Sequence, residues 1–313
     1  MPALHPPFPW SGGEGGQGGW RGVLDRKRPE APRASGLSRR RLLGLATAAV
    51  GLLGEGGWRR AGAGPPSRRW GADDPRTLSA LERLHFPAVR LPVMTGNGDR
   101  VPITIEMSHP MEPGHHITRV TVVNERDPVP LKGIFEFTPA NGLVHLAFQA
   151  RIDEGASEVA VTAECNLHGA WTSTGAVRVA DGQGGCAAPA PPGGRSTPVD
   201  ILPPRLRLPS LVRTGRVRPD EVLEVQLLMR HPNRTGLVRR DGKFVAESEP
   251  FHLRELEVFY GEARVSRFLF TSALSDDPLI TFRLRAGQGG VLRVLLANTR
   301  GQRFEALTRV EVS

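Results

Sequence analysis

The sequence predicts an all-β protein built from two small β-sandwiches, and two observations carry this prediction. Short stretches of alternating apolar and polar residues recur from about residue 91 onward, separated by turns of Gly, Asn, Asp and Pro. A segment rich in Gly, Ala and Pro, residues 182–200, divides these stretches into two groups and is expected to be a flexible linker. A chain of 313 residues is long enough for each group to bury its own core.

The individual elements follow from their periodicity. Residues 77–85 are the one stretch after the leader that looks helical. Val101, Ile103, Ile105 and Met107 share one face of a strand, and the same alternation returns in residues 159–165 and 222–229. We therefore expect a first sandwich over residues 78–181 and a second over residues 201–313.

The charge of the chain is concentrated before these strands. The net charge is +9, but residues 1–63 hold ten basic and four acidic residues, so the rest carries only +3. That remainder has no basic run interleaved with aromatic residues, which argues against a nucleic-acid partner.

The basic segment has the features of an export signal. We expect residues 1–37 to be an unstructured leader and residues 38–63 to be a Tat signal peptide, because Arg39-Arg40-Arg41 precedes the apolar run Leu42–Leu53 and the small residues Ala61-Gly62-Ala63. The run is short for a membrane span. The expectation is therefore a periplasmic protein with no stable membrane insertion after cleavage, the alternative being a short uncleaved anchor.

Histidines gather in the first predicted sandwich. The stretch HPMEPGHHI, residues 109–117, holds three of the nine histidines, and Cys165-Asn166-Leu167-His168 follows another predicted strand. Together with His85 these residues predict a metal site, whereas the alternative is a polar, histidine-rich surface with a buried cysteine. We expect His116 to be a surface imidazole and His145 to be structural.

These motifs resemble the iron domain of superoxide reductases (desulfoferrodoxin and neelaredoxin). The resemblance covers residues 85–171 and rests on HFP, HPMEPGH and CNLHGAW. It implies an immunoglobulin-like fold and a mononuclear non-haem iron, whose ligands would be His85, His109, His115, Cys165 and His168. In that family a lysine precedes the first histidine, but here Leu84 takes its place, which puts fast superoxide turnover in doubt.

The first predicted sandwich also resembles SoxY, the sulfur-carrier subunit of periplasmic thiosulfate oxidation. The matching stretches are NGDRVP, Pro110-Met111, residues 124–130 and FTPANG at 137–142. The SoxY carrier arm ends in GGCGG; this chain keeps Gly184-Gly185-Cys186 and continues into the linker. The resemblance implies that Cys186 is the sulfur-carrier thiol.

The second half resembles SoxZ, the partner of that carrier. The similarity rests on residues 229–236, 240–243, 275–282 and 298–301. His231 falls in a turn of the first of these stretches, and we expect its role to be structural. The chain is thus identified as similar to a SoxY–SoxZ fusion.

The residues around Cys186 suggest how such a carrier works. A thiol between glycines and a Pro/Ala strap is expected to be exposed and to reach several enzyme clefts in turn. The alternative is a disulfide between Cys165 and Cys186, since both are present in an exported chain.

Two functions of different class follow. One is a Sox-type carrier of sulfur compounds that also holds iron, with other periplasmic Sox-type enzymes as partners. The other is a superoxide reductase-like iron oxidoreductase with the SoxZ-like domain as a docking module, which needs a redox donor protein because the sequence contains no flavin or Fe–S motif. The second interpretation makes the chain an enzyme, whereas the first makes it a carrier protein.

Overall fold

Strands dominate the computed structural model, which describes residues 68–70, 78–187 and 200–313. The prediction of an all-β protein is confirmed for these residues. Their α-helices are α1 (Ala80–His85) and α2 (Pro209–Thr214), so the short helical stretch predicted at residues 77–85 is present. The expected leader, the Tat signal peptide and linker residues 188–199 lie outside the described residues.

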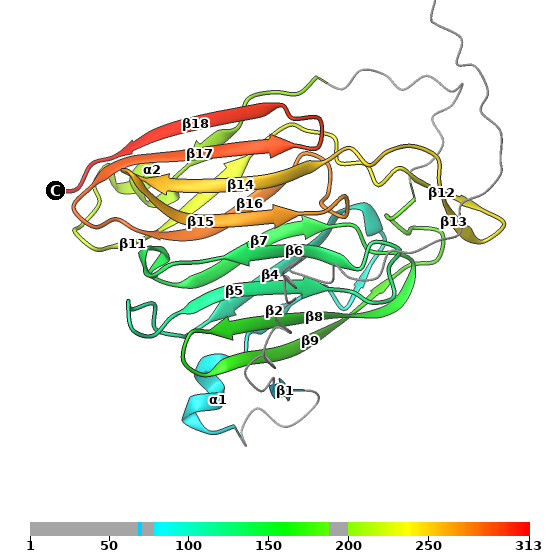
Figure 1. Cartoon of the computed structure of the whole chain (residues 1–313), viewed down its shortest axis with the longest axis horizontal. Coiled ribbons are helices and arrows are strands. Elements are labelled where there is room, and N and C mark those ends of the chain that lie inside the picture. Colours follow the sequence, from blue (N-terminus) through cyan, green and yellow to red (C-terminus); the bar gives the residue numbers. More distant parts are fainter. Residues whose placement is uncertain (1–67, 71–77, 188–199) are drawn as a thin grey trace, which may run out of the picture. The chain divides into compact units, whose positions relative to one another are not determined.

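The larger of two main sheets runs through both halves of the chain (Figure 1). Nine of its strands follow one another in the order β1 (Arg68–Trp70), β9 (Gly169–Val179), β8 (Gly155–Cys165), β5 (Ile117–Val123), β6 (Leu131–Glu136), β15 (Ala263–Phe270), β14 (Leu253–Tyr260), β17 (Gly290–Asn298) and β18 (Arg303–Val310). The short strand β3 (Met94–Thr95) also pairs with β9.

The smaller sheet lies behind it in the view of Figure 1. Its order is β10 (Arg205–Arg207), β11 (Val222–Leu228), β16 (Leu279–Arg285), β7 (Val144–Ala150), β4 (Val101–Met107) and β2 (Ala88–Arg90). A separate hairpin is formed by β12 (Leu237–Arg240) and β13 (Lys243–Ala246), and 3₁₀ turns occupy Gly98–Arg100 and Pro139–Asn141.

Both sheets continue across the boundary between the two halves. Strand β6 of the first half pairs antiparallel with β15 of the second, with Phe135 opposite Phe268. Strand β7 pairs in the same way with β16, with Leu146 opposite Phe282. The sequence did not indicate whether the two halves contact each other, and the structure shows that they share hydrogen-bonded sheets. Their subdivision into two immunoglobulin-like sandwiches stays a prediction.

The core lies between the two sheets. The aromatic ring of Phe135 on the larger sheet is 5.0 Å from that of Phe148 on the smaller one, and Phe268 is 5.6 Å from Phe282. All four side chains are almost completely buried. The alternation seen in the sequence is thus the alternation of inward and outward side chains on each strand. Among the described residues, no helix is long and apolar enough to span a membrane.

Candidate functional site

A helix end, a loop and a strand end with its turn bring the predicted metal ligands to one end of the first half. His85 is the last residue of α1, and His109 and His115 lie in the loop between β4 and β5. Cys165 ends β8, and His168 lies in the turn that leads to β9. The loop that carries His115 is closed by paired backbone hydrogen bonds between Glu112 and His115, at 3.0 and 3.1 Å.

The side chains of all five residues converge. The Nε2 atom of His85 lies 3.2 Å from Nε2 of His109, 3.4 Å from Nε2 of His115 and 3.1 Å from Nδ1 of His168. Nδ1 of His168 is in turn 3.1 Å from Nε2 of His115 and 3.6 Å from Sγ of Cys165. The ligand atoms of His85, His109, His115 and Cys165 all lie within 4.8 Å of one another.

Hydrogen bonds fix which nitrogens carry lone pairs. Nδ1 of His85 donates to the Leu81 carbonyl at 2.6 Å, and Nδ1 of His109 donates to the Pro110 carbonyl at 2.6 Å. In the neutral rings the Nε2 atoms are therefore acceptors, and two acceptor lone pairs face each other across 3.2 Å. Such an arrangement is repulsive unless a cation lies between the nitrogens.

The imidazoles are held in the neutral form that binds metals. The pKa of His109 is lowered to about 4, mainly by burial and also by the neighbouring imidazoles, against the opposing effect of the Pro110 carbonyl. The pKa of His85 and that of His115 are also lowered, in both cases mainly by burial and then by nearby histidines. Near neutral pH these side chains bind a metal without first releasing a proton.

The donor set fits a transition-metal ion. Two imidazole nitrogens at right angles around one ion, each bound at about 2.1 Å, lie about 3.0 Å apart, close to the 3.1–3.4 Å seen here. Imidazole and thiolate together suit Fe, Zn or Cu rather than Mg or Ca. The five residues predicted from the sequence would thus hold such an ion, whereas His145 pairs with Glu106 at 3.3 Å on the smaller sheet instead.

Neighbouring groups orient these ligands. The indole of Trp171 stacks on His85 with ring centroids 4.9 Å apart, and its Nε1 donates to the His168 carbonyl at 3.1 Å. The backbone N–H of Leu167 donates to Sγ of Cys165 at 3.5 Å. Contacts of this kind set ring orientation and ligand basicity at metal sites.

Ser79 positions His85 through the helix cap. Its hydroxyl accepts from the N–H of Glu82 at 3.2 Å, and the Glu82 carboxylate accepts from the N–H of Ser79 at 2.8 Å. We expect Ser79→Ala to weaken α1 by about 1 kcal/mol and to lower apparent metal affinity roughly fivefold. Titration against a competing chelator measures this effect, with Ser210→Ala on α2 as the control. Equal affinity of the Ser79→Ala and Ser210→Ala proteins would contradict it.

The environment of Cys186 corrects one expectation. The sequence predicted an exposed thiol on a flexible segment starting at residue 182, but Cys186 is 0% exposed. The backbone of the arm is bound to the first half: the N–H of Gly98 donates to Gln183 and the N–H of Gly185 donates to Ile152, both at 2.9 Å. Glycine permits mobility, and it equally permits close backbone packing. A Cβ on Gly185 would lie 2.1 Å from the Gly98 carbonyl oxygen.

Side chains from both halves hold the last residues of the arm. Arg151 donates to the Gly185 carbonyl at 3.1 Å, and the hydroxyl of Thr235 donates to the Cys186 carbonyl at 2.7 Å. Burial, followed by the nearby Asp127 carboxylate, raises the pKa of Cys186 from 9.0 to about 12. The docked thiol is therefore protonated and unreactive at neutral pH. Both cysteines are free, so the disulfide alternative is not realised in the structure.

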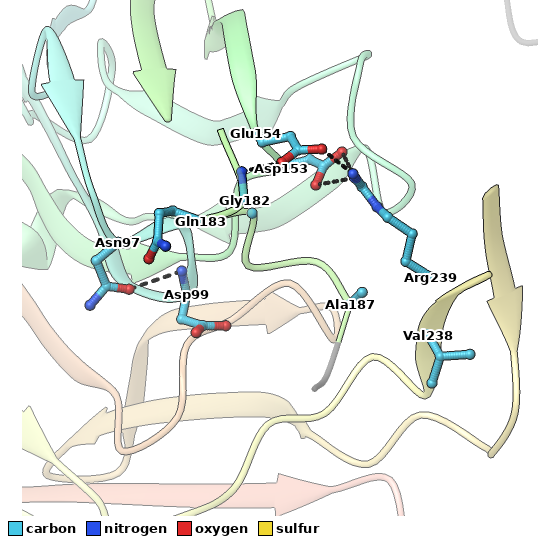
Figure 2. A pocket seen from close by; sticks show the side chains of 10 residues that line it. Asn97, Asp99, Asp153, Glu154, Gly182, Gln183, Ala187, Val238 and Arg239 are labelled. Atoms are coloured by element: carbon cyan, nitrogen blue, oxygen red, sulfur yellow. Dashed lines mark hydrogen bonds and ion pairs between the residues drawn. The ribbon is translucent and has the colours of Figure 1, made fainter. Parts of the chain in front are cut away.

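A charged bridge lies beside the arm (Figure 2). Arg239 of β12 binds the Asp153 carboxylate at 2.8 and 2.9 Å and also binds Glu154. Glu154 in turn accepts from the N–H of Gly182 at 2.6 Å. A cavity of about 440 Å³ lies between this bridge and the arm. Sequence reasoning missed Arg151, Arg239 and Thr235; of these, only Thr235 lay in a recognised motif.

The two sites lie at opposite ends of strand β8. Cys165 ends the strand at the histidine cluster, whereas Asp153 and Glu154 beside the arm precede its first residue, Gly155. Strand β9 spans the same length in the other direction and leads into the arm. Eleven residues of β-strand place the two sites about 33 Å apart.

Two protein families match the chain. The model of sulfur oxidation protein SoxY matches residues 83–186, and that of sulfur oxidation protein SoxZ matches residues 212–309. A search among curated proteins finds no match.

Solved structures similar to part of the chain include two superoxide reductases (neelaredoxins). The one from Ignicoccus hospitalis is 21% identical, over 30% of this chain and 80% of that chain, with a TM-score of 0.28. The one from Archaeoglobus fulgidus, in the reduced form, is 20% identical, over 32% of this chain and 96% of that chain, with a TM-score of 0.25. Similarity at this level says nothing about activity.

Proposed function

From a chain that contains a SoxY domain followed by a SoxZ domain, we propose a periplasmic carrier of sulfur compounds in thiosulfate oxidation, exported by the Tat route. Cys186 is its carrier thiol. The observation that carries this proposal is that the SoxY match ends at Gly185-Cys186, on a peptide held by contacts from both domains. Other Sox-type enzymes are the expected partners.

The docked arm gives the carrier a resting state. While the arm is docked, the thiol is protonated and inaccessible. Release into water returns the pKa toward its ordinary value, and the thiolate becomes the nucleophile. Oxidative coupling of this thiolate to thiosulfate forms a sulfur–sulfur bond and releases two electrons, which a partner oxidoreductase must accept.

Mass spectrometry of the intact protein tests the carrier proposal. After incubation with thiosulfate and the partner Sox enzymes, we expect a covalent adduct on the native chain and none on Cys186→Ala. His109→Ala, which removes one imidazole from the other site, should still form the adduct. A native chain that stays unmodified under these conditions would rule the carrier role out.

The histidine cluster supports a second activity. We propose that His85, His109, His115, Cys165 and His168 hold one non-haem iron. The facing Nε2 lone pairs of His85 and His109 are the observation that favours this assignment. Ferrous iron in such a site supplies one-electron reduction of a small anion such as superoxide, with electrons from a redox donor protein. The residues themselves orient the donors and keep three imidazoles neutral.

The charge next to this site differs from the superoxide reductase pattern. Leu84 stands where that family has a lysine, and the guanidinium of the neighbouring Arg83 donates to the Leu78 carbonyl. The chain therefore lacks the cation in the usual position for attracting superoxide. Metal analysis of the purified native protein is the first test of this second activity.

The two activities are separate within one chain. Cys186 is seven residues beyond Val179, the last residue of β9. A fully extended arm released up to that residue reaches about 25 Å, whereas the histidine cluster lies about 33 Å away, at the other end of β9. The backbone of the released arm thus ends short of the cluster, which favours action of the metal on a diffusible molecule or on another chain.

A further inference from the structure

A second cavity lies where the two domains meet at the carrier arm. Its volume is about 490 Å³. It is lined by side chains from both domains: Asp99, Arg100, Arg151, Arg234, Thr235 and Asp276. The sequence motifs did not indicate it, and the carrier role proposed above does not use it.

The cavity carries excess positive charge. Arg151, whose side chain is largely buried, binds both carboxylates of the lining, Asp276 at 3.0 Å and Asp99. Arg100 donates to the backbone carbonyl of Asp276 at 2.9 Å and pairs with no carboxylate of the residues that the structure describes. The exposed guanidinium of Arg234 forms no ion pair within the described part of the chain. Three guanidinium groups and two carboxylates give the lining one net positive charge, and the guanidinium groups of Arg100 and Arg234 are the ones open to an anion.

The same cavity is coupled to the carrier peptide. Arg151 and Thr235, which line it, donate the hydrogen bonds that hold the carbonyl groups of Gly185 and Cys186. Because Thr235 both lines the cavity and binds the Cys186 carbonyl, the cavity lies next to Cys186. An anion that binds Arg151 competes with the Gly185 carbonyl for the same guanidinium.

A loaded arm cannot keep the position of the free thiol. The docked Cys186 side chain is fully buried, and the cations that act on it are already paired: Lys132 binds Asp127, and Arg151 binds Asp99 and Asp276. A sulfonate carries a permanent negative charge, and burying such a charge without a cationic partner is costly. The cavity lined by Arg100, Arg151 and Arg234 offers guanidinium groups together with open volume beside the arm.

We propose that this cavity is an oxyanion-binding site that receives the sulfonate end of the cargo carried on Cys186. The inference rests on the proposed carrier function. Guanidinium groups match the geometry of sulfur oxyanions because each presents two parallel N–H donors. Binding there moves Arg151 away from Gly185, so that a loaded arm leaves the position in which the free thiol is protected.

Calorimetric titration of full-length Cys186→Ala protein with thiosulfate tests the cavity without covalent chemistry. We expect saturable binding that weakens with added salt. Arg234→Ala should weaken it about tenfold, since hydrogen bonds to charged groups contribute most to such binding, and Arg100→Ala should do so as well. Arg309→Ala, which removes an exposed arginine paired with Glu311 on the edge strand β18, should bind as the parent does.

The outcomes distinguish this inference from the carrier role. If Cys186→Ala binds no thiosulfate, or if Arg234→Ala and Arg100→Ala proteins with unchanged circular dichroism bind it as well as the parent, the oxyanion site is refuted, even where adducts form on native Cys186. If thiosulfate binds in the arginine-dependent way while no adduct forms with the partner enzymes, the cavity stands and the carrier role fails.

Discussion

Protein purified after expression in iron-rich medium is expected to contain about one iron per chain, because five nitrogen and sulfur donors converge on one ion-sized space. Its oxidised form should show a thiolate-to-iron charge-transfer band in the visible spectrum. Cys165→Ser should abolish this band, and His109→Ala should lower the iron content at least tenfold, by the order of magnitude typical for weakened metal sites. Elemental analysis and absorption spectroscopy measure both effects.

The control for this experiment is His145→Ala. This imidazole lies on the smaller sheet beside Glu106, outside the cluster, and its loss should leave the iron content unchanged.

Iron binding should weaken as the pH falls. Burial lowers the pKa of His109 to about 4, so this ligand stays neutral until the pH falls near that value, and iron should be released on further acidification. Colourless, iron-free protein from an iron-rich preparation would remove the iron site from the proposal.

Gly185→Ala is expected to expose the carrier thiol. The new Cβ would lie 2.1 Å from the Gly98 carbonyl oxygen, so the arm cannot dock with its present hydrogen bonds. Once undocked, the pKa of Cys186 should fall from about 12 toward 9.0, which raises the thiolate fraction at neutral pH by about a thousandfold. The rate of alkylation by iodoacetamide should rise by up to the same factor. Transient opening of the arm in the native protein sets the background rate with which this rise is compared.

Gly182→Ala is a matched control in the same segment, because no atom lies within 4 Å of a Cβ at that position. Because φ is +75° at this position, the Gly182→Ala substitution adds local strain without a clash, and it should alter thiol reactivity far less than Gly185→Ala does.

Docking of the arm in the native protein should depend on pH. Because the pKa of Cys186 is raised on docking, the docked state is favoured below about pH 9 and is progressively lost as the pH rises toward 12. Equal alkylation rates for Gly185→Ala and native protein would show that Cys186 is not protected by docking.

The strand pattern and the members of the histidine–cysteine cluster were readable from the sequence because both are recorded in short local stretches. Alternating side chains report directly which face of a strand is buried, as the buried Val101, Ile103 and Ile105 show. The histidine and cysteine positions were recognisable because HFP, HPMEPGH and CNLHGAW resemble the superoxide reductase motifs in their order. The convergence of His85, His109 and His168 required only that these stretches meet at one end of the domain.

The carrier arm shows the opposite case. Glycine beside a cysteine has two structural meanings, a mobile chain or a closely packed one, and local sequence cannot choose between them. The choice depends on Gly98 and Ile152, which approach the arm from a 3₁₀ turn and a loop of the same domain, and on Thr235, which approaches it from a loop of the other domain.

By itself, the sequence determined that the chain is rich in strands, that its halves resemble SoxY and SoxZ, and which five side chains make up the histidine–cysteine cluster. The tertiary structure alone decided that the halves share both sheets, that Cys186 is buried, and that arginines from both domains form a cavity beside it. The reason is physical: side-chain alternation and ligand chemistry are encoded locally, whereas pKa shifts, charge pairing and the docking of a glycine-rich arm arise only when distant residues come into contact.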